Sequence, residues 1–175
     1  MSTYIFGYGS LVNLESLEKT IKRKLKPNEI HPVTLNGYTR VWNYTAKIFA
    51  AELNKEITAV YLNIAPFHNS SLNGIVFEVS DSELELLKKR ELFYSLVDIT
   101  ANVKFDGNVK VFTFICYDKQ HLTDYDTKCF VMKKYIDIVN SGFESISENF
   151  LTEYNKTTQP QPYKVISGDY TFVSS

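Results

Sequence analysis

Phe6-Gly7-Tyr8-Gly9-Ser10-Leu11 is the stretch that decides the fold, because two of the chain's seven glycines stand two residues apart in it. The apolar run from Tyr4 to Tyr8 predicts a short buried strand that the glycines end. Asn13 is suited to cap a short helix directly afterwards. A glycine-rich turn between a strand and a helix lets the backbone approach a ligand and present N–H groups to an anion. A plain tight turn accounts for the glycines equally well.

Three common motifs do not fit this turn. A dinucleotide fingerprint requires glycine where Val12 stands, and a phosphate-binding P-loop requires a Gly-Lys-Ser/Thr ending that is absent here. A nucleophile elbow requires glycine at positions 8 and 12, on either side of Ser10. A serine hydrolase that uses Ser10 is therefore the weakest of the enzyme hypotheses.

Strands and helices are predicted to mix along the rest of the chain. The predicted strands cover residues 33–44, 57–64, 74–79, 92–105, 108–117 and 170–173, and the predicted later helices cover residues 127–141 and 144–155. Asp106-Gly107 between two strand-like runs predicts a tight hairpin turn. This pattern favours one mixed α+β domain over residues 1–175.

A further helix is predicted from its capping signals. Ser80 and Glu83 have the spacing of a capping box at the helix start. Lys88-Lys89-Arg90 supplies the cations that a helix C-terminus prefers. The helix is therefore expected to end near Arg90, with Glu91 at its exit.

The charge balance excludes some classes of partner. The chain has 19 Lys+Arg against 20 Asp+Glu, whereas nucleic-acid binders concentrate positive charge, so no nucleic-acid partner is expected. The basic run Lys22-Arg23-Lys24 predicts a solvated surface loop. No apolar run has the length of a membrane span, so no membrane association is expected.

The cysteines and histidines show no metal or disulfide pattern. The start of the sequence lacks the features of a signal peptide, which favours a cytoplasmic protein with Cys116 and Cys129 reduced. His31, His68 and His121 are far apart without ligand spacing, so no metal site is expected.

Aromatic residues and one arginine share a parity in the strand predicted for residues 33–44. Tyr38, Trp42 and Tyr44 would lie on one face, where ordinary sheet packing explains them. Arg40 has the same parity. It would either meet a carboxylate among those rings or stack on an aromatic ring at the surface.

The glycine turn resembles the N-terminal signature of the γ-glutamylcyclotransferase superfamily. Residues 35–43, residues 72–80 and Arg90-Glu91 follow in the order typical of that family, with Tyr94 soon after. The resemblance covers residues 4–100 well and the remainder by pattern. It implies the α+β fold of that superfamily, with a mixed curved sheet or small barrel flanked by helices.

The resemblance also implies roles for particular residues. The turn would hold the glutamyl part of the substrate through Phe6, Gly7, Tyr8, Gly9, Ser10 and Leu11. The family's catalytic glutamate corresponds to Glu91. Tyr94 and Tyr135, which stands seven residues before Gly142, correspond to substrate-binding positions. Many relatives have glycine directly after the glutamate, and Leu92 here implies a reshaped loop on the leaving-group side.

The implied reaction is the release of 5-oxoproline from a small-molecule γ-glutamyl compound. The α-amine attacks the γ-carbonyl of the same molecule, so the reaction requires proximity and proton transfer but no cofactor. A helix C-terminus and burial would raise the pKa of Glu91, and Arg90 and Lys88 would oppose this. A solvated glutamate at a helix end is the alternative for Glu91. A binding module that no longer catalyses is the alternative function, and a homodimer is possible for either.

Overall fold

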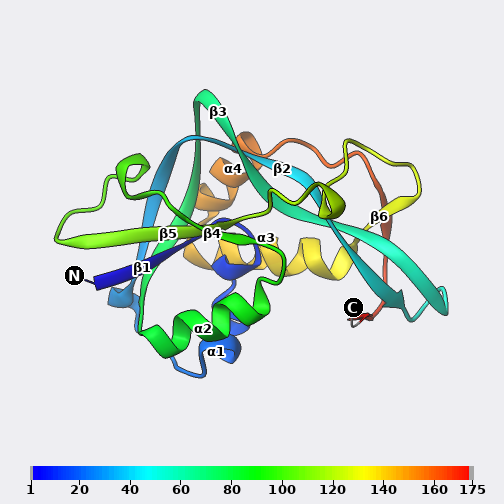
Figure 1. The fold of residues 1–175 in the computed structure, drawn as a ribbon, viewed down its shortest axis with the longest axis horizontal. Helices are drawn as coiled ribbons and strands as arrows, with labels where there is room; N and C mark the ends of the chain where they lie inside the picture. The colour runs from blue at the N-terminus through cyan, green and yellow to red at the C-terminus, as the bar shows by residue number, and fades with distance from the viewer. Residues whose placement is uncertain (1, 174–175) are drawn as a thin grey trace.

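Two long strands dominate the computed structural model, which describes residues 2–173 (Figure 1). β2 (Ile30–Ala50) and β3 (Lys55–Val79) pair antiparallel along almost their whole length. The register shifts between Asn36 and Tyr38 and again between Trp42 and Tyr44. Such bulges bend a strand and increase its twist, so the pair curves instead of lying flat.

The remaining strands extend this pair into one mixed sheet. They are β1 (Ser2–Gly7), β4 (Ser95–Asp98), β5 (Val109–Ile115), β6 (Cys129–Met132), β7 (Lys164–Ile166) and β8 (Tyr170–Phe172). The main order is β4-β5-β1-β3-β2-β8, with β6 pairing β3 and β7. β1 runs antiparallel to β3 and parallel to β5. β4 and β8 end the path without pairing with each other, so the sheet is curved and unclosed within residues 2–173.

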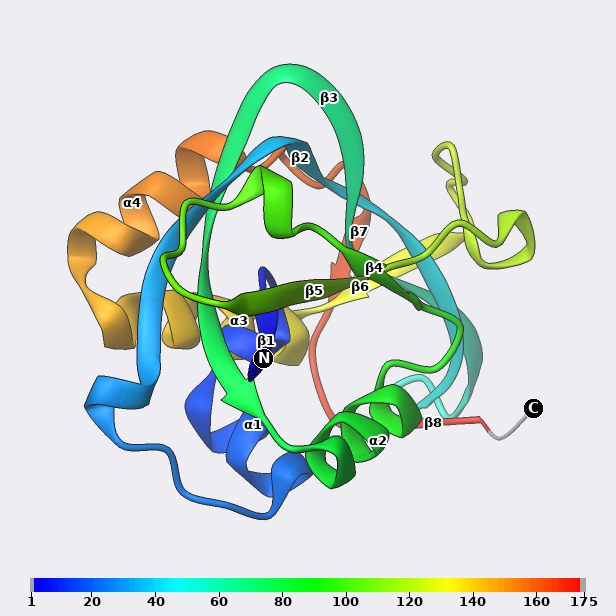
Figure 2. The same cartoon turned by 60° about the vertical axis from the view of Figure 1, so that its left-hand side comes forward.

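Four α-helices accompany the sheet in the described part of the chain. They are α1 (Leu14–Ile21), α2 (Asp81–Arg90), α3 (Lys133–Ile146) and α4 (Glu148–Thr157). α1 packs beside α2, and α3 packs beside α4 against β3 (Figure 2). The expected α+β class is therefore confirmed. None of the helices in residues 2–173 is long and apolar enough to cross a membrane.

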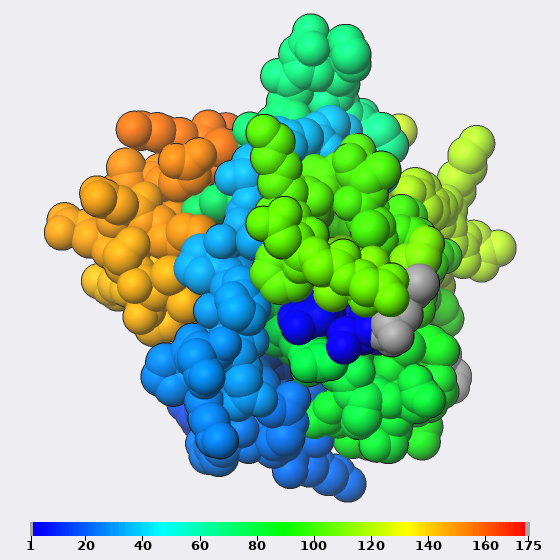
Figure 3. Space-filling view, turned by 90° about the vertical axis from the view of Figure 1, so that its left-hand side faces the viewer, coloured from blue at the N-terminus to red at the C-terminus, as the bar shows by residue number. Residues whose placement is uncertain are grey.

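β1 lies at the centre of the sheet because its sequence is apolar on both faces. Ile5 and Phe6 are fully buried between β3 and β5. A strand buried on both faces reads as a continuous apolar run, which Tyr4 to Tyr8 provides. Figure 3 shows the start of β1, in dark blue, between two segments coloured green, with β2 beside them in light blue. The strand therefore carries the glycine turn from the surface into the interior.

The two predicted helix starts are confirmed. Asn13 caps α1 by accepting a hydrogen bond from the Ser16 N–H at 3.0 Å. Ser80 and Glu83 form the reciprocal capping box of α2. α2 ends at Arg90 as expected, with Glu91 as its C-cap residue.

Several other boundaries were wrong. Residues 57–64 and 74–79 belong to the single strand β3, because the bulged partner β2 stays paired through the intervening bend. Of residues 92–105 only Ser95–Asp98 is a strand, and a long loop with a 3-10 helix at Thr100–Asn102 joins β4 to β5. Asp106-Gly107 is thus no two-residue hairpin turn. Tertiary pairing overrides the local turn signal here.

The C-terminal half differs in a similar way. Residues 129–132 form β6 because they pair with β3 and β7, so α3 begins at Lys133 and not near residue 127. α4 begins at Glu148, where the Ser147 hydroxyl accepts from the Phe150 N–H. The short strand β7 was not predicted, whereas β8 was. Cys116 and Cys129 are both free and buried.

Candidate active site

A cavity of about 930 Å³ brings most of the predicted site residues together. It lies among the glycine turn, the exit of α2, the paired strands β2 and β3, and the start of α3. The predicted residues that line it are Phe6, Tyr8, Gly9, Ser10, Leu11, Glu91, Tyr94 and Tyr135. Gly7 lies outside the lining, and a Cβ there would sit 2.9 Å from the Leu11 Cβ. Gly7 therefore lets the turn close on itself.

Glu91 reaches the cavity because α2 stops there in a tight turn. Its N–H still donates to the Leu87 carbonyl at 2.8 Å, and its own carbonyl accepts from the Tyr94 N–H at 3.1 Å. Phe93 closes this turn with a φ of 69°, in the left-handed region that non-glycine residues seldom adopt. The turn places Glu91 and Tyr94 on the same cavity wall.

The environment of Glu91 favours its protonated form. The side chain is only 16% exposed, and burial raises the pKa of its carboxyl above the ordinary range. Arg90 opposes this shift through its charge and a hydrogen bond, with Nε 3.1 Å from Glu91 Oε1. Burial is the larger effect, so the pKa stays raised. A carboxyl group with a raised pKa is suited both to give and to take a proton during a reaction.

Arg90 ties Glu91 to the glycine turn. Its guanidinium donates to the Ser16 carbonyl and the Thr20 hydroxyl, both at 2.9 Å, and to the Ser10 hydroxyl at 3.1 Å. Ser10 therefore faces a hydrogen-bond donor instead of a base, which gives no support to a serine nucleophile. Arg90 was expected to act as a helix-end cation and to oppose the rise in the pKa of Glu91, but its contacts with Ser10, Ser16 and Thr20 were not predicted.

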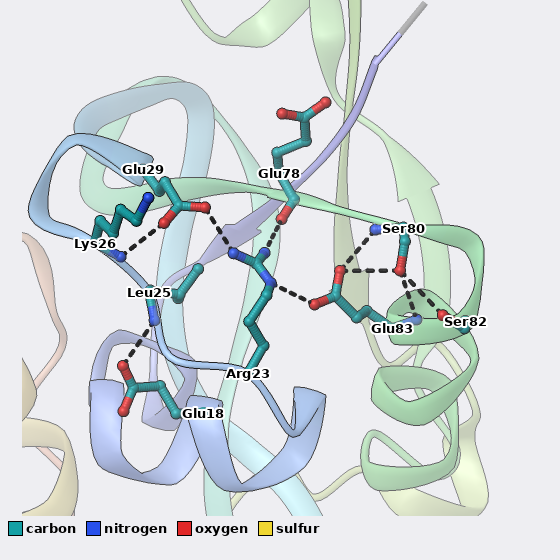
Figure 4. A network of polar contacts seen from close by, with 9 residues as sticks. All are labelled: Glu18, Arg23, Leu25, Lys26, Glu29, Glu78, Ser80, Ser82 and Glu83. Atoms are coloured by element: carbon teal, nitrogen blue, oxygen red, sulfur yellow. Dashed lines mark hydrogen bonds and ion pairs between the residues drawn. The ribbon is translucent and has the colours of Figure 1, made fainter.

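The start of α2 is held by Arg23 (Figure 4). Arg23 pairs with Glu29 and Glu83 at 2.6 Å each and donates to the Glu78 carbonyl at 3.1 Å. Glu83 also completes the cap at Ser80. Lys22 and Lys24 are exposed as predicted, whereas Arg23 is half-buried and links the loop after α1 to β3 and α2.

Tyr135 stands against the turn because α3 approaches it closely. A Cβ at Gly142 would lie 2.6 Å from the Asn13 nitrogen, so only glycine permits this packing. Asn13 in turn donates from its side chain to the Ile138 carbonyl at 3.1 Å. Two helical turns before Gly142, the Tyr135 hydroxyl lies 3.3 Å from the position of a Cβ on Gly9. The seven-residue spacing therefore aims this hydroxyl at the turn.

The tyrosine hydroxyl groups around the cavity differ in whether they already donate a hydrogen bond within the protein. Those of Tyr8 and Tyr94 donate to the carbonyls of Phe114 and Leu62, both at 2.8 Å. That of Tyr135 accepts from the Leu62 N–H at 3.4 Å and keeps its proton available. Burial raises the pKa of all three tyrosines, so each is neutral.

Arg40 fixes the turn from behind. It is fully buried, donates from Nε to the Tyr8 carbonyl at 2.7 Å, and donates to the Asn73 carbonyl. Its guanidinium lies 4.9 Å from the ring centres of both Phe143 and Tyr154. Stacking on aromatic rings is confirmed, but the surface location is wrong. Burial lowers the pKa of Arg40 to about 9, and none of its partners within residues 2–173 is a carboxylate.

Several other aromatic residues of the cavity were not predicted as site residues from the sequence. Tyr44 was interpreted as packing, yet its hydroxyl donates to the Leu92 carbonyl at 3.1 Å and its ring lines the cavity. Tyr61, Tyr170 and Phe172 line it as well. No local motif marks these three, because their proximity depends on the pairing of β2 with β3 and β8. Within residues 2–173 no group of three or more His, Cys, Asp or Glu side chains could hold a metal ion.

Comparisons with known proteins identify the fold. No family model matches the sequence, and no curated protein is significantly similar to it. A solved structure named γ-glutamyl cyclotransferase aligns with a TM-score of 0.63 and 11% identity, over 97% of this chain and 95% of the other. An uncharacterized protein from Homo sapiens aligns at 0.62 and 11%, over 96% and 94%. A yeast enzyme, titled a γ-glutamyl cyclotransferase specific to glutathione, aligns at 0.53 and 12%, over 93% and 90%.

These similarities define the class of the protein at the level of structure. The chain has the γ-glutamylcyclotransferase-like fold, and the resemblance noted in the sequence is confirmed to that extent.

Proposed function

We propose that the chain is a γ-glutamylcyclotransferase, which releases 5-oxoproline and a free amine from a γ-glutamyl peptide or amine. The observation that carries this proposal is the shared cavity, in which a buried glutamate with a raised pKa and the glycine turn lie together. Two solved structures with a similar fold are named as γ-glutamyl cyclotransferases. The proposed location is the cytoplasm, and the proposed partner is a small molecule.

The cavity is suited to fold the substrate back on itself. Attack by the α-amine on the γ-carbonyl is intramolecular, so positioning replaces a protein nucleophile. The glycine turn and the available proton of Tyr135 supply donors for the substrate carboxylate or for the oxyanion that develops. Arg40 and Gly142 act behind these donors by holding the turn and α3 in place.

Glu91 is proposed to move the protons. As the new C–N bond forms, its carboxylate takes a proton from the α-amine. As the original amide C–N bond breaks, the carboxyl group returns that proton to the departing amine. One group serves both steps because its raised pKa brings the free energies of its ionised and protonated forms closer together. General acid–base catalysis of this kind contributes roughly 10²- to 10⁴-fold in rate.

A product screen tests the proposal. The protein is incubated with γ-glutamyl dipeptides, glutathione and γ-glutamyl-ε-lysine, and 5-oxoproline is measured by mass spectrometry. Glu91→Gln should abolish formation of the product, whereas Glu85→Gln, an exposed change on the same helix, should not. The absence of 5-oxoproline from every compound would contradict the proposal. Thermal stabilisation by a γ-glutamyl ligand without product, equal in wild type and Glu91→Gln, would instead indicate a binding module.

A further inference from the structure

One wall of the cavity is built from aromatic side chains that the proposed reaction does not use. Tyr44, Tyr61, Tyr170 and Phe172, here called the aromatic wall, all line it. The Tyr44 ring lies 4.4 Å from that of Tyr94, which is close to Glu91 in the chain. From Tyr44 the rings continue to Tyr61 at 6.1 Å and from there to Phe172 at 5.7 Å. The wall thus leads from the proposed reaction centre to the C-terminal strand β8.

The cavity exceeds the needs of a glutamyl group. Its volume of about 930 Å³ is near the upper end of the roughly 300–1,000 Å³ typical of pockets for drug-sized ligands. The glycine turn and Tyr135 account for the part beside Glu91. The part beside the aromatic wall is left for the group that departs.

The wall contains an unpartnered polar group. The Tyr61 side chain is 5% exposed, and its hydroxyl has no hydrogen-bond partner within residues 2–173. Burial raises the pKa of the Tyr61 hydroxyl and the neighbouring Tyr170 raises it further, but the two hydroxyls do not meet in hydrogen-bonding geometry. A buried hydroxyl without a partner costs free energy, so an acceptor on a ligand would be favoured there.

The charges around the cavity indicate the sign of the ligand. Glu91 is the sole carboxylate among its described lining residues, whereas Lys19, Lys47, Lys89 and Arg90 all line it. Lys19 is paired with Glu15, but Lys47 and Lys89 form no ion pair within residues 2–173. The Lys47 ammonium itself points away from the wall, since it donates to the Thr58 hydroxyl at 2.8 Å on the opposite face of β2 and β3 from Tyr44 and Tyr61. A leaving group with a negative charge is favoured over a cationic one.

We infer that the aromatic wall is the leaving-group subsite and that it selects an aromatic amino acid. The aryl ring packs against Tyr44 and Phe172, and the carboxylate of the departing amino acid accepts from the Tyr61 hydroxyl. The substrate class is then a γ-glutamyl-aromatic amino acid, such as γ-glutamyl-phenylalanine. This inference rests on the proposed cyclotransferase function and adds to it the identity of the amine.

Three substrates test recognition of the aromatic ring separately from recognition of the carboxylate. γ-Glutamyl-phenylalanine has the ring and the carboxylate, γ-glutamyl-alanine lacks the ring, and γ-glutamyl-phenethylamine lacks the carboxylate. We expect kcat/KM for γ-glutamyl-phenylalanine to exceed that for either of the others by about tenfold, the order expected for one buried ring or one charged contact. Equal values for γ-glutamyl-phenylalanine and γ-glutamyl-alanine would overturn the inference while leaving the proposed function in place.

Two variants link these preferences to the wall. Phe172 is 63% exposed, so Phe172→Ala should fold normally. This variant should lower kcat/KM for γ-glutamyl-phenylalanine about threefold to tenfold and leave kcat/KM for γ-glutamyl-alanine unchanged. Tyr61→Phe removes only the hydroxyl and should cost a similar factor for both substrates with a carboxylate, but not for γ-glutamyl-phenethylamine. Variants that affect all three substrates alike would show that the wall is merely structural.

A binding measurement decides the case in which no substrate is turned over. That result would refute the proposed function, and the subsite would then be tested by isothermal titration of the Glu91→Gln protein. Tighter binding of γ-glutamyl-phenylalanine than of γ-glutamyl-alanine, lost in Phe172→Ala, would support the subsite. Equal affinities, or no binding of either, would overturn it.

Discussion

Replacing Arg40 by lysine should destabilise the protein strongly, although the positive charge is kept. The Arg40 guanidinium serves the buried carbonyls of Tyr8 and Asn73 and the Thr157 hydroxyl at once. An ammonium group lacks the planar fork and can replace only one of these contacts well. A hydrogen bond from a charged donor contributes about 1.5–3 kcal/mol, and a neutral one about 1 kcal/mol. Lysine loses two of the three contacts, both from a charged donor, which predicts a decrease of about 3–6 kcal/mol in the free energy of unfolding.

A second arginine provides the matched control. Arg23 is also multiply paired, but its side chain is 35% exposed, and exposed ion pairs contribute no more than about 1 kcal/mol. Urea unfolding at pH 7, followed by circular dichroism and tyrosine fluorescence, should show Arg23→Lys within about 1 kcal/mol of wild type. Equal losses for Arg23→Lys and Arg40→Lys, or no loss for Arg40→Lys, would refute the assignment of Arg40 as the residue that holds the turn.

Four further variants test separate parts of the site. Burial raises the folded-state pKa of Glu91, so the free energy of unfolding of wild type should fall as pH rises from the unfolded-state pKa of about 4.3 through the folded-state pKa. In urea titrations, the stability of Glu91→Gln relative to wild type should therefore increase from pH 4 to pH 7. A difference that stays constant over this range would contradict the raised pKa. Gly74→Ala should cost about 3 kcal/mol or more or prevent folding, because its Cβ would clash with the Gly7 carbonyl oxygen. A variant with the Tm of wild type would show that β1 and β3 are not so closely packed. Tyr135→Phe should reduce kcat/KM about tenfold with little change in unfolding, and unchanged kinetics would remove its hydroxyl from the reaction. Tyr61→Phe should stabilise the unliganded protein by about 1 kcal/mol in the same assay, and a loss of stability would mean that its hydroxyl is already satisfied.

The features that local sequence determines were predicted well. Asn13, Ser80 and Glu83 cap helices through residues three positions away, so their signals survive any tertiary arrangement. The exit of α2 at Glu91 follows from the same local rules. The glycine turn and its apolar strand were also visible, because Ile5 and Phe6 are buried on both sides of the sheet.

The features that depend on long-range pairing were not predicted from the sequence. Residues 129–132 look like the start of a helix until β3 and β7 are placed beside them. For Arg40 the sequence left a carboxylate partner and surface stacking as alternatives, because its buried carbonyl acceptors lie 32 and 33 residues away in the chain. Tyr61 and Phe172 meet through two strand pairings, so the aromatic wall has no sequence signature.

Glu91 is proposed to transfer protons to and from a γ-glutamyl group held by the glycine turn. The most direct test compares kcat and ligand affinity in wild type and Glu91→Gln, using the best substrate from the product screen. We expect kcat to fall roughly 10²- to 10⁴-fold in Glu91→Gln, with a dissociation constant close to that of wild type. A Glu91→Gln protein that still releases 5-oxoproline at a rate within a few-fold of wild type would contradict it.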